Sequence, residues 1–100
     1  MVSFQKTEAE GEDTEEEVLE AILEFRREEA VEEFSSIEVA ETLYELAALR
    51  LKRKSLRESL DNIEECIEIY QGYLNRWQVE SYKKALSEAR RFRRKILHAM

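Results

Sequence analysis

Clustered carboxylates are the residues of this chain best suited to chemistry. Glu28, Glu29 and Glu32 form an E-E-x-x-E pattern, and Glu38 and Glu41 follow it in the next stretch of predicted helix. Two antiparallel helices that present such side chains to each other could hold Mg²⁺, because this ion prefers oxygen ligands. A Glu-rich chain also produces this pattern as a solvated acidic face. We adopt the solvated face and expect no metal and no cofactor, with Glu28, Glu29, Glu32 and Glu41 as the candidate metal ligands of the alternative.

The metal-binding alternative corresponds to a known protein family. The acidic pattern resembles the all-α nucleotide pyrophosphatases of the MazG type, which would imply Mg²⁺-dependent release of pyrophosphate from nucleotides. The family's second acidic motif ends in Asp, and the matching position of this chain is Glu41.

The single histidine and the single cysteine are the other candidates for chemistry. Arg93 and His98 have the spacing of the ribonuclease motif of HEPN domains, but His98 lies two residues from the end of the sequence and we interpret it as inert. Cys66 falls within an apolar stripe and is expected to be a small buried thiol. No Cys and His residues have zinc-site spacing. We predict that the protein is not an enzyme and has no catalytic residues.

Composition bounds the class of protein. A chain of 100 residues is one domain, and the absence of Pro with only two Gly argues against phosphate-binding loops. Uncharged runs are only a few residues long, so we expect no membrane span. One cysteine allows no disulfide within the chain, which fits a reducing, cytoplasmic location. The 39% content of charged residues also resembles thermophilic proteins.

Charge is divided unevenly along the chain. Residues 1–49 carry 16 acidic and three basic side chains, a formal charge of −13, whereas residues 50–100 carry seven acidic and 13 basic side chains, a formal charge of +6. The two halves should attract, either within one molecule or between two. The basic run over 90–95 could contact phosphates, but the chain is acidic overall and no aromatic residues interleave for base stacking. We do not expect nucleic acid as a direct partner.

A helix-start signal recurs about every twenty residues. In each case a capping side chain stands three residues before a Glu or Gln that can reach back to the cap's own N–H. The pairs are Thr14 and Glu17, Ser35 and Glu38, Ser55 and Glu58, and Asn75 and Gln78. Apolar residues at helical spacing follow each pair.

The signals predict an all-α four-helix bundle, with helices over about 15–34, 36–52, 56–71 and 76–98 in a single domain over 14–100, after a disordered acidic tail over 1–13. Leu46 and Leu49 widen the apolar face of the second helix, which predicts burial on two sides. Gly72 is expected to end the third helix in the left-handed conformation. No helix breaker lies between Arg50 and Lys54, so a continuous helix over 37–71 is the alternative to a turn.

The second and third predicted helices resemble one tetratricopeptide repeat. The matching residues are Leu43, Leu46, Ala47, Ser59, Ile63 and Cys66. Small residues at 47, 59 and 66 would let the two helices approach closely where they cross. Trp77 has the residue type favoured one repeat length after Leu43, whereas Glu80 and Lys84 do not fit the repeat. The resemblance implies a helical hairpin flanked by an N-terminal and a C-terminal helix.

A hairpin with one further helix is similar to MIT domains, the tetratricopeptide-like modules that bind helical peptides of ESCRT-type proteins. Residues 85–93 resemble the third helix of that family in the spacing of apolar and small residues. The resemblance implies a groove between helices that accepts an amphipathic helix or an extended peptide.

The chain from residue 15 onward also resembles the helical domain of GINS subunits, scaffolds of the replicative helicase. The similarity lies in the acidic-basic run over 25–29, the apolar break at 33–34 and the closing run over 93–99. The small β domain of that family is absent from this sequence. The resemblance implies a wide, flat interface anchored by tyrosines.

We predict a non-catalytic protein–protein interaction or assembly module of the tetratricopeptide or MIT type, which binds a helical or extended peptide of a partner protein or forms a homo-oligomer. The alternative is a GINS-like scaffold subunit of a DNA replication complex, and the MazG-like pyrophosphatase is a more distant one. The expected partner-binding residues are Tyr44, Tyr70, Tyr73, Arg90, Arg91, Arg94 and Lys95.

Overall fold

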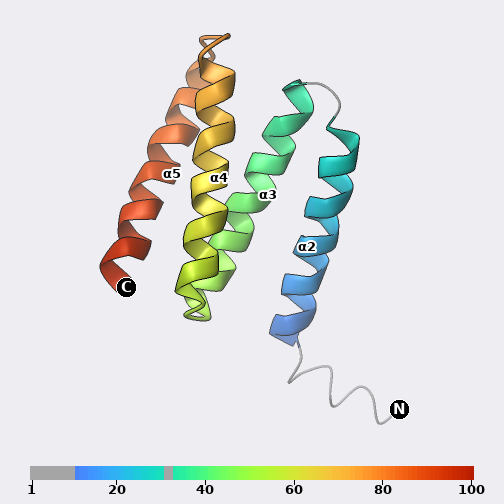
Figure 1. The fold of residues 1–100 in the computed structure, drawn as a ribbon, viewed down its shortest axis with the longest axis vertical. Coiled ribbons are helices and arrows are strands. Elements are labelled where there is room, and N and C mark those ends of the chain that lie inside the picture. The colour runs from blue at the N-terminus through green and yellow to red at the C-terminus, as the bar shows by residue number, and fades with distance from the viewer. Residues whose placement is uncertain (1–10, 31–32) are drawn as a thin grey trace.

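The computed structural model describes residues 11–30 and 33–100, which form four helices and no strand (Figure 1). The helices are α2 (Gly11–Glu29), α3 (Glu33–Lys52), α4 (Leu56–Leu74) and α5 (Glu80–Ala99). Each helix runs antiparallel to the one before it (Figure 1). The prediction of an all-α four-helix bundle is therefore confirmed.

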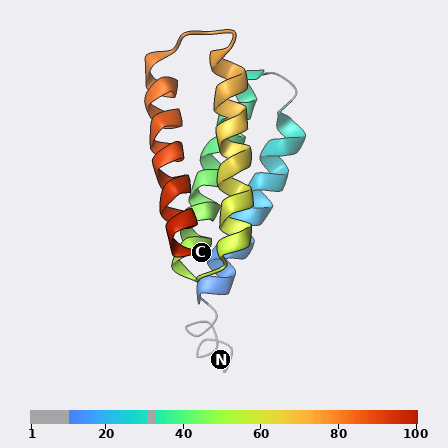
Figure 2. The ribbon, with the colours of Figure 1, turned by 60° about the vertical axis from the view of Figure 1, so that its left-hand side comes forward.

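The α3–α4 hairpin forms the centre of the molecule. α2 packs against α3 and α5 packs against α4, so α2 and α5 lie on opposite sides of the hairpin (Figures 1 and 2). Since helix direction alternates, α3 and α5 run parallel, as do α2 and α4. This arrangement decides which of the predicted functional residues can meet.

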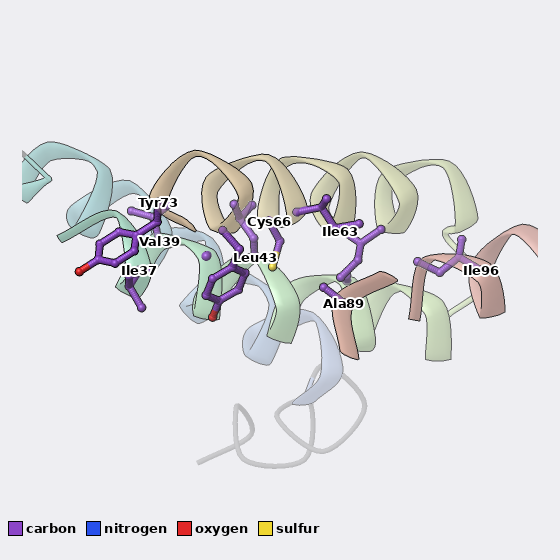
Figure 3. Packing of buried hydrophobic residues seen from close by; sticks show 12 residues of the cluster. Ile37, Val39, Leu43, Ile63, Cys66, Tyr73, Ala89 and Ile96 are labelled. Carbon is purple, nitrogen blue, oxygen red and sulfur yellow. The ribbon is translucent and has the colours of Figure 1, made fainter. Parts of the chain in front are cut away.

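Most of the hydrophobic core comes from α3 and α4 (Figure 3). Its buried residues are Ile37, Val39, Ala40, Leu43, Ala47, Ile63, Cys66, Ile67, Tyr70, Tyr73, Ala89 and Ile96. Leu46 and Leu49 are also buried. The expected burial of the second helix on two sides is confirmed, because α3 lies between α2 and α4.

The crossing of α3 and α4 is built from small residues. Ala47, Ser59 and Cys66 are all fully buried, and the Ser59 hydroxyl donates a 2.6 Å hydrogen bond to the Ala47 carbonyl oxygen. A hydroxyl can bond the backbone of a neighbouring helix only where the two helices come close. The predicted close approach is confirmed at positions 47 and 59, and Cys66 is buried in the same core.

A turn separates α3 from α4, so the alternative of a continuous helix over 37–71 is wrong. Lys54 has a φ of 65°, the left-handed conformation. The Lys54 N–H bonds to the Leu51 carbonyl at 3.0 Å, and the Ser55 N–H bonds to the Arg50 carbonyl at 2.8 Å. These two bonds form a Schellman motif, with Lys54 at the position that glycine usually occupies. Lys54 therefore ends the helix, although lysine rarely adopts this conformation and is not recognised in a sequence as a helix breaker.

Only one of the four helix-start signals coincides with a helix start. Ser55 is the N-cap of α4, although its side chain makes no capping hydrogen bond. Thr14 lies inside α2 and Ser35 inside α3, because these helices begin at Gly11 and Glu33. Local capping chemistry can be satisfied at several places along a charged chain, and packing selects among them.

The signal at Asn75 serves the end of α4 instead of the start of α5. The Asn75 N–H bonds to the Gln71 carbonyl, and the Gln78 side-chain amide donates to the Leu74 carbonyl at 2.9 Å. α5 begins at Glu80, with Val79 as its N-cap. The predicted start near residue 76 is therefore wrong by four residues.

Gly72 does not end α4, and no described glycine has a positive φ. The helix continues to Leu74 because Tyr73 is buried, with its ring centroid 4.8 Å from that of Trp77 and 4.9 Å from that of Tyr82. Aromatic burial of this kind outweighs the preference of glycine for a cap, which is worth about 1 kcal/mol.

The first helix is displaced from its predicted bounds. α2 begins at Gly11, so residues 11–13 are helical and not part of a disordered tail, while the remainder of that predicted tail lies outside the described residues. The helix ends at Glu29 and not at residue 34. Its end coincides with the charged run over 26–29, which interrupts the apolar stripe. Residues 31–32 are outside the described residues.

Candidate functional site: a groove between α3 and α5

A groove with a volume of about 590 Å³ runs between the parallel helices α3 and α5. Its walls and floor are Glu41, Tyr44 and Glu45 from α3, Tyr70 from α4, and Ala85, Glu88, Arg91, Phe92 and Lys95 from α5. Residues three or four apart on a helix share one face, which is why each wall is a set at this spacing. α4 supplies the floor because α3 and α5 both pack on it.

The floor of the groove is aromatic. The ring centroids of Tyr44 and Phe92 lie 5.1 Å apart with the planes tilted by 36°, so these two side chains join the walls directly. Tyr70 is buried beneath the groove, whereas Tyr44 and Phe92 remain partly exposed. Such rings offer a ligand apolar area at low cost in side-chain entropy.

The tyrosine hydroxyls in the groove stay protonated at neutral pH. Burial is the main cause that raises the pKa of Tyr44, and the charge of Glu88 adds to it. Burial also raises the pKa of Tyr70, with contributions from Cys66, Glu41 and Glu88. Both side chains are therefore neutral groups that can donate or accept hydrogen bonds.

The rim of the groove carries charges of both signs. Glu41 and Glu45 lie on α3, and Glu88, Arg91 and Lys95 lie on α5. None of these five side chains forms an ion pair with another described residue, although the Lys95 ammonium lies 6.0 Å from the centroid of the Phe92 ring. The parallel course of the helices places Glu41 and Glu88 toward one end of the groove and Lys95 toward the other. The charges are thus available to a ligand.

The structure brings four of the seven predicted partner-binding residues together, since Tyr44, Tyr70, Arg91 and Lys95 all line the groove. Tyr73 lies elsewhere, in the buried aromatic cluster beside Trp77 and Tyr82. Arg90 and Arg94 are exposed on α5 outside the groove.

The candidate metal ligands do not converge. Glu28 and Glu29 are exposed at the end of α2, and Glu41 lies in the groove. Glu32 falls outside the described residues. Among the described residues, no group of three or more His, Cys, Asp or Glu side chains is placed to hold a metal ion.

Cys66 and His98 lie in opposite environments. Cys66 is fully buried, and burial, with a smaller effect of the Glu65 charge, raises the pKa of its thiol to about 12. A protonated, inaccessible thiol is unreactive, as a buried structural cysteine should be. His98 is exposed near the end of α5, and Arg93 is 3.4 Å from a carboxylate oxygen of Glu64.

A polar network centred on Arg50 was not predicted from the sequence. This side chain is 10% exposed and donates hydrogen bonds to Glu16 and Asn62 at 3.0 and 2.8 Å, and to Glu20 at 2.5 Å. Arg53 also donates to Glu16, at 2.5 Å. The network joins α2, α3 and α4. A signal was present, because Arg50 continues the apolar stripe of α3 at a helical spacing of three residues after Ala47.

α2 makes further polar contacts with the hairpin, and its Leu23 also packs against the hydrophobic core. Arg26 donates to the Thr42 hydroxyl at 2.6 Å, and Arg27 makes a bidentate pair with Glu65 on α4 at 2.6 and 3.0 Å. The acidic helix therefore meets Arg50 of α3, Arg53 of the following turn and the Glu65 carboxylate of α4. The basic end of α5, which was a candidate for this role within one molecule, lies on the far side of the hairpin (Figure 1).

Comparison with known proteins assigns no family to the chain: no family model, no curated protein and no solved structure matches it. The fold defines a class only, an all-α four-helix bundle with an open groove. Within the described residues, none of the helices combines the length and the apolar character needed to cross a membrane.

Proposed function

We propose that this protein is a non-catalytic interaction module, which binds a helical or extended peptide segment of a partner protein in the groove between α3 and α5. The observation that carries the proposal is the combination of an aromatic floor with rim charges that have no ion-pair partner among the described residues. The rim charges are exposed to solvent, and a ligand of complementary charge can use them for orientation.

The size of the groove fits this role. A volume of about 590 Å³ lies within the range of specific ligand sites. It holds several side chains of a peptide but not a whole helix, so one face of an amphipathic segment would enter it. The rest of the segment would lie along the walls of α3 and α5, as in other helix-in-groove complexes.

The helix arrangement supports a tetratricopeptide-like or MIT-like module over the alternatives. The small-residue crossing joins α3 to α4, and α5 returns parallel to α3 to close one side of the groove. A scaffold that used Tyr70 and Tyr73 as anchors of a flat interface has less support, because both are only 5% exposed. The pyrophosphatase alternative needs a cluster of carboxylates, and the described residues do not form one.

Selection of peptides from a random twelve-residue display library on the immobilised protein tests the proposal. Selected peptides are then titrated by calorimetry against the wild type and two matched variants of α5. Lys95→Glu reverses a charge that lines the groove, and Lys84→Glu makes the same change on an exposed residue outside it.

We expect Lys95→Glu to change peptide affinity by about fivefold, because a charge at the edge of a site typically contributes about 1 kcal/mol. Lys84→Glu should change it less than twofold. Peptides that bind both variants and the wild type equally, or a library that yields no binder, would contradict the proposal.

A further inference from the structure

The two outer edges of the bundle carry opposite charge. α2 contains nine acidic and two basic residues, a formal charge of −7, and α5 contains two acidic and seven basic residues, a formal charge of +5. The two helices lie on opposite sides of the α3–α4 hairpin (Figures 1 and 2). Since they do not meet within one molecule, the attraction between them is available between molecules.

The outer face of α2 combines carboxylates with exposed apolar side chains. Val18 is 50% exposed and Phe25 is 63% exposed, and a separation of seven residues places them on one face of the helix. Glu17 and Glu24 flank this stripe, are exposed, and form no ion pair with a described residue. The carboxylates of α2 that are already paired, such as Glu16, lie on the opposite face, toward α3.

The outer face of α5 carries arginines. Arg90 and Arg94 are exposed, lie one helical turn apart, and form no ion pair with a described residue. Leu97 follows on the adjacent surface with 42% exposure. Guanidinium groups can pair with carboxylates and can also stack on an aromatic ring such as that of Phe25.

We propose that copies of this chain associate head to tail, with the α5 outer face of one molecule against the α2 outer face of the next. Helix direction supports this pairing, because a second copy shifted sideways without rotation would set its α5 antiparallel to α2. The alternation of helix direction along α2, α3, α4 and α5 would then continue across the boundary between molecules (Figure 1). Such a heterologous contact leaves one edge of each end copy free and so permits chains longer than two.

Sedimentation velocity from micromolar to millimolar protein tests the proposal at two ionic strengths. At about 0.02 M salt the screening length is about 20 Å, and at about 0.5 M it falls to about 4 Å. We expect the average mass of the wild type to rise with concentration at low salt and to stay at the monomer value at high salt.

Charge-reversal variants test the pairing itself. Glu17→Lys with Glu24→Lys changes the formal charge of α2 from −7 to −3, and Arg90→Glu with Arg94→Glu changes that of α5 from +5 to +1. Each double variant alone should associate at least about tenfold more weakly than the wild type, because like charges then meet at the reversed positions and the attraction between the two edges is reduced. A mixture of the two double variants should recover association, since the unchanged α2 edge of one variant can pair with the unchanged α5 edge of the other.

Glu58→Lys with Glu68→Lys is the control for the α2 double variant, because it makes the same change in net charge on exposed positions of α4 away from both edges. Circular dichroism of each variant verifies the fold. A wild type that is monomeric at low salt throughout the concentration range overturns the proposal. Association that survives in either edge variant alone, or that is lost in the α4 control, overturns it as well.

Discussion

At the scale of single residues, Arg50 is the side chain that connects α2, α3 and α4 through its hydrogen bonds. Its guanidinium bonds to three residues of two other helices, and the planar group satisfies them in different directions. Two of these partners are carboxylates. Glu20 is half exposed and Glu16 is about three-quarters buried, so the contact to Glu16 is the better shielded from solvent.

Removal of this guanidinium should be costly. We expect Arg50→Met to lower the free energy of unfolding by about 2 kcal/mol, because it leaves the largely buried Glu16 carboxylate without one of its two arginines. Arg50→Lys should lower it by about 1 kcal/mol, since one ammonium cannot reach all three partners. Urea unfolding at neutral pH measures both changes, with the exposed Arg90→Lys as the control; equal midpoints for all three variants would contradict this role.

Cys66 should make the protein sensitive to alkali. The folded state raises the thiol pKa from its ordinary value of 9.0 to about 12, so the folded chain binds more protons than the unfolded chain between these values. The contribution of the buried thiol to the free energy of unfolding is therefore fully present below pH 9, and it is lost as the pH rises toward 12. At pH 10 the loss from this group is about 1 kcal/mol.

The test compares urea midpoints at pH 7 and pH 10 for the wild type and Cys66→Ala. The free energy of unfolding of the wild type should fall more between the two pH values than that of the variant. The variant loses only the contribution of other groups with a raised pKa, such as Tyr70. An equal fall in stability in both proteins would contradict the prediction that the Cys66 thiol ionises on unfolding at pH 10.

The sequence predicted the environment of Cys66 but not that of Arg50, and the reason is physical. A small apolar residue within a helical stripe has one favourable place, the core. An arginine at a stripe position can extend into solvent or be buried with partners, and only the tertiary structure decides. For the groove, the residue types of Tyr44, Tyr70, Arg91 and Lys95 were predicted, but the alignment of α3 with α5 that brings them together was not.

At the scale of helices and turns, the connection between α3 and α4 shows how a turn can form without a glycine. Lys54 adopts the left-handed conformation, which costs a non-glycine residue about 1 kcal/mol. The two Schellman hydrogen bonds and the buried crossing of Ala47 and Ser59 compensate for this cost.

Lys54→Gly should therefore stabilise the protein. We expect a gain of about 0.5–1 kcal/mol in the free energy of unfolding, because glycine adopts a positive φ without steric conflict and its larger entropy in the unfolded chain offsets only part of the gain. Lys84→Gly, within α5, is the matched control and should lose about 0.8 kcal/mol. Thermal unfolding distinguishes the two, and a loss in Lys54→Gly would mean that the turn is not strained.

Helix number and approximate extent could be predicted from the spacing of apolar residues, but helix ends could not. α4 continues beyond Gly72 because Tyr73 packs against Trp77 in the turn and Tyr82 in α5. A capping signal is a local property, whereas the position of a helix end depends on which side chains the tertiary structure buries.

At the scale of the whole molecule, the separation of charge along the chain is converted into a separation in space. The sequence allowed the acidic and basic halves to meet within one molecule or between two. The structure places α2 and α5 on opposite sides of the central hairpin and lets α2 use Arg50 and Arg53 instead. Much of the positive charge of α5 thus stays at the surface, in the groove rim and on the outer edge.

The polar attachment of α2 also divides the molecule into parts of unequal strength. None of the side chains described over 15–30 is fully buried, whereas α3 and α4 share a continuous apolar interface. The part of a protein with the fewest buried apolar contacts opens at the lowest free energy, so we expect α2 to be the first helix to separate from the rest. Its departure would uncover Leu46 and Thr42 on α3, and the unit that remains would be a three-helix domain with its groove intact.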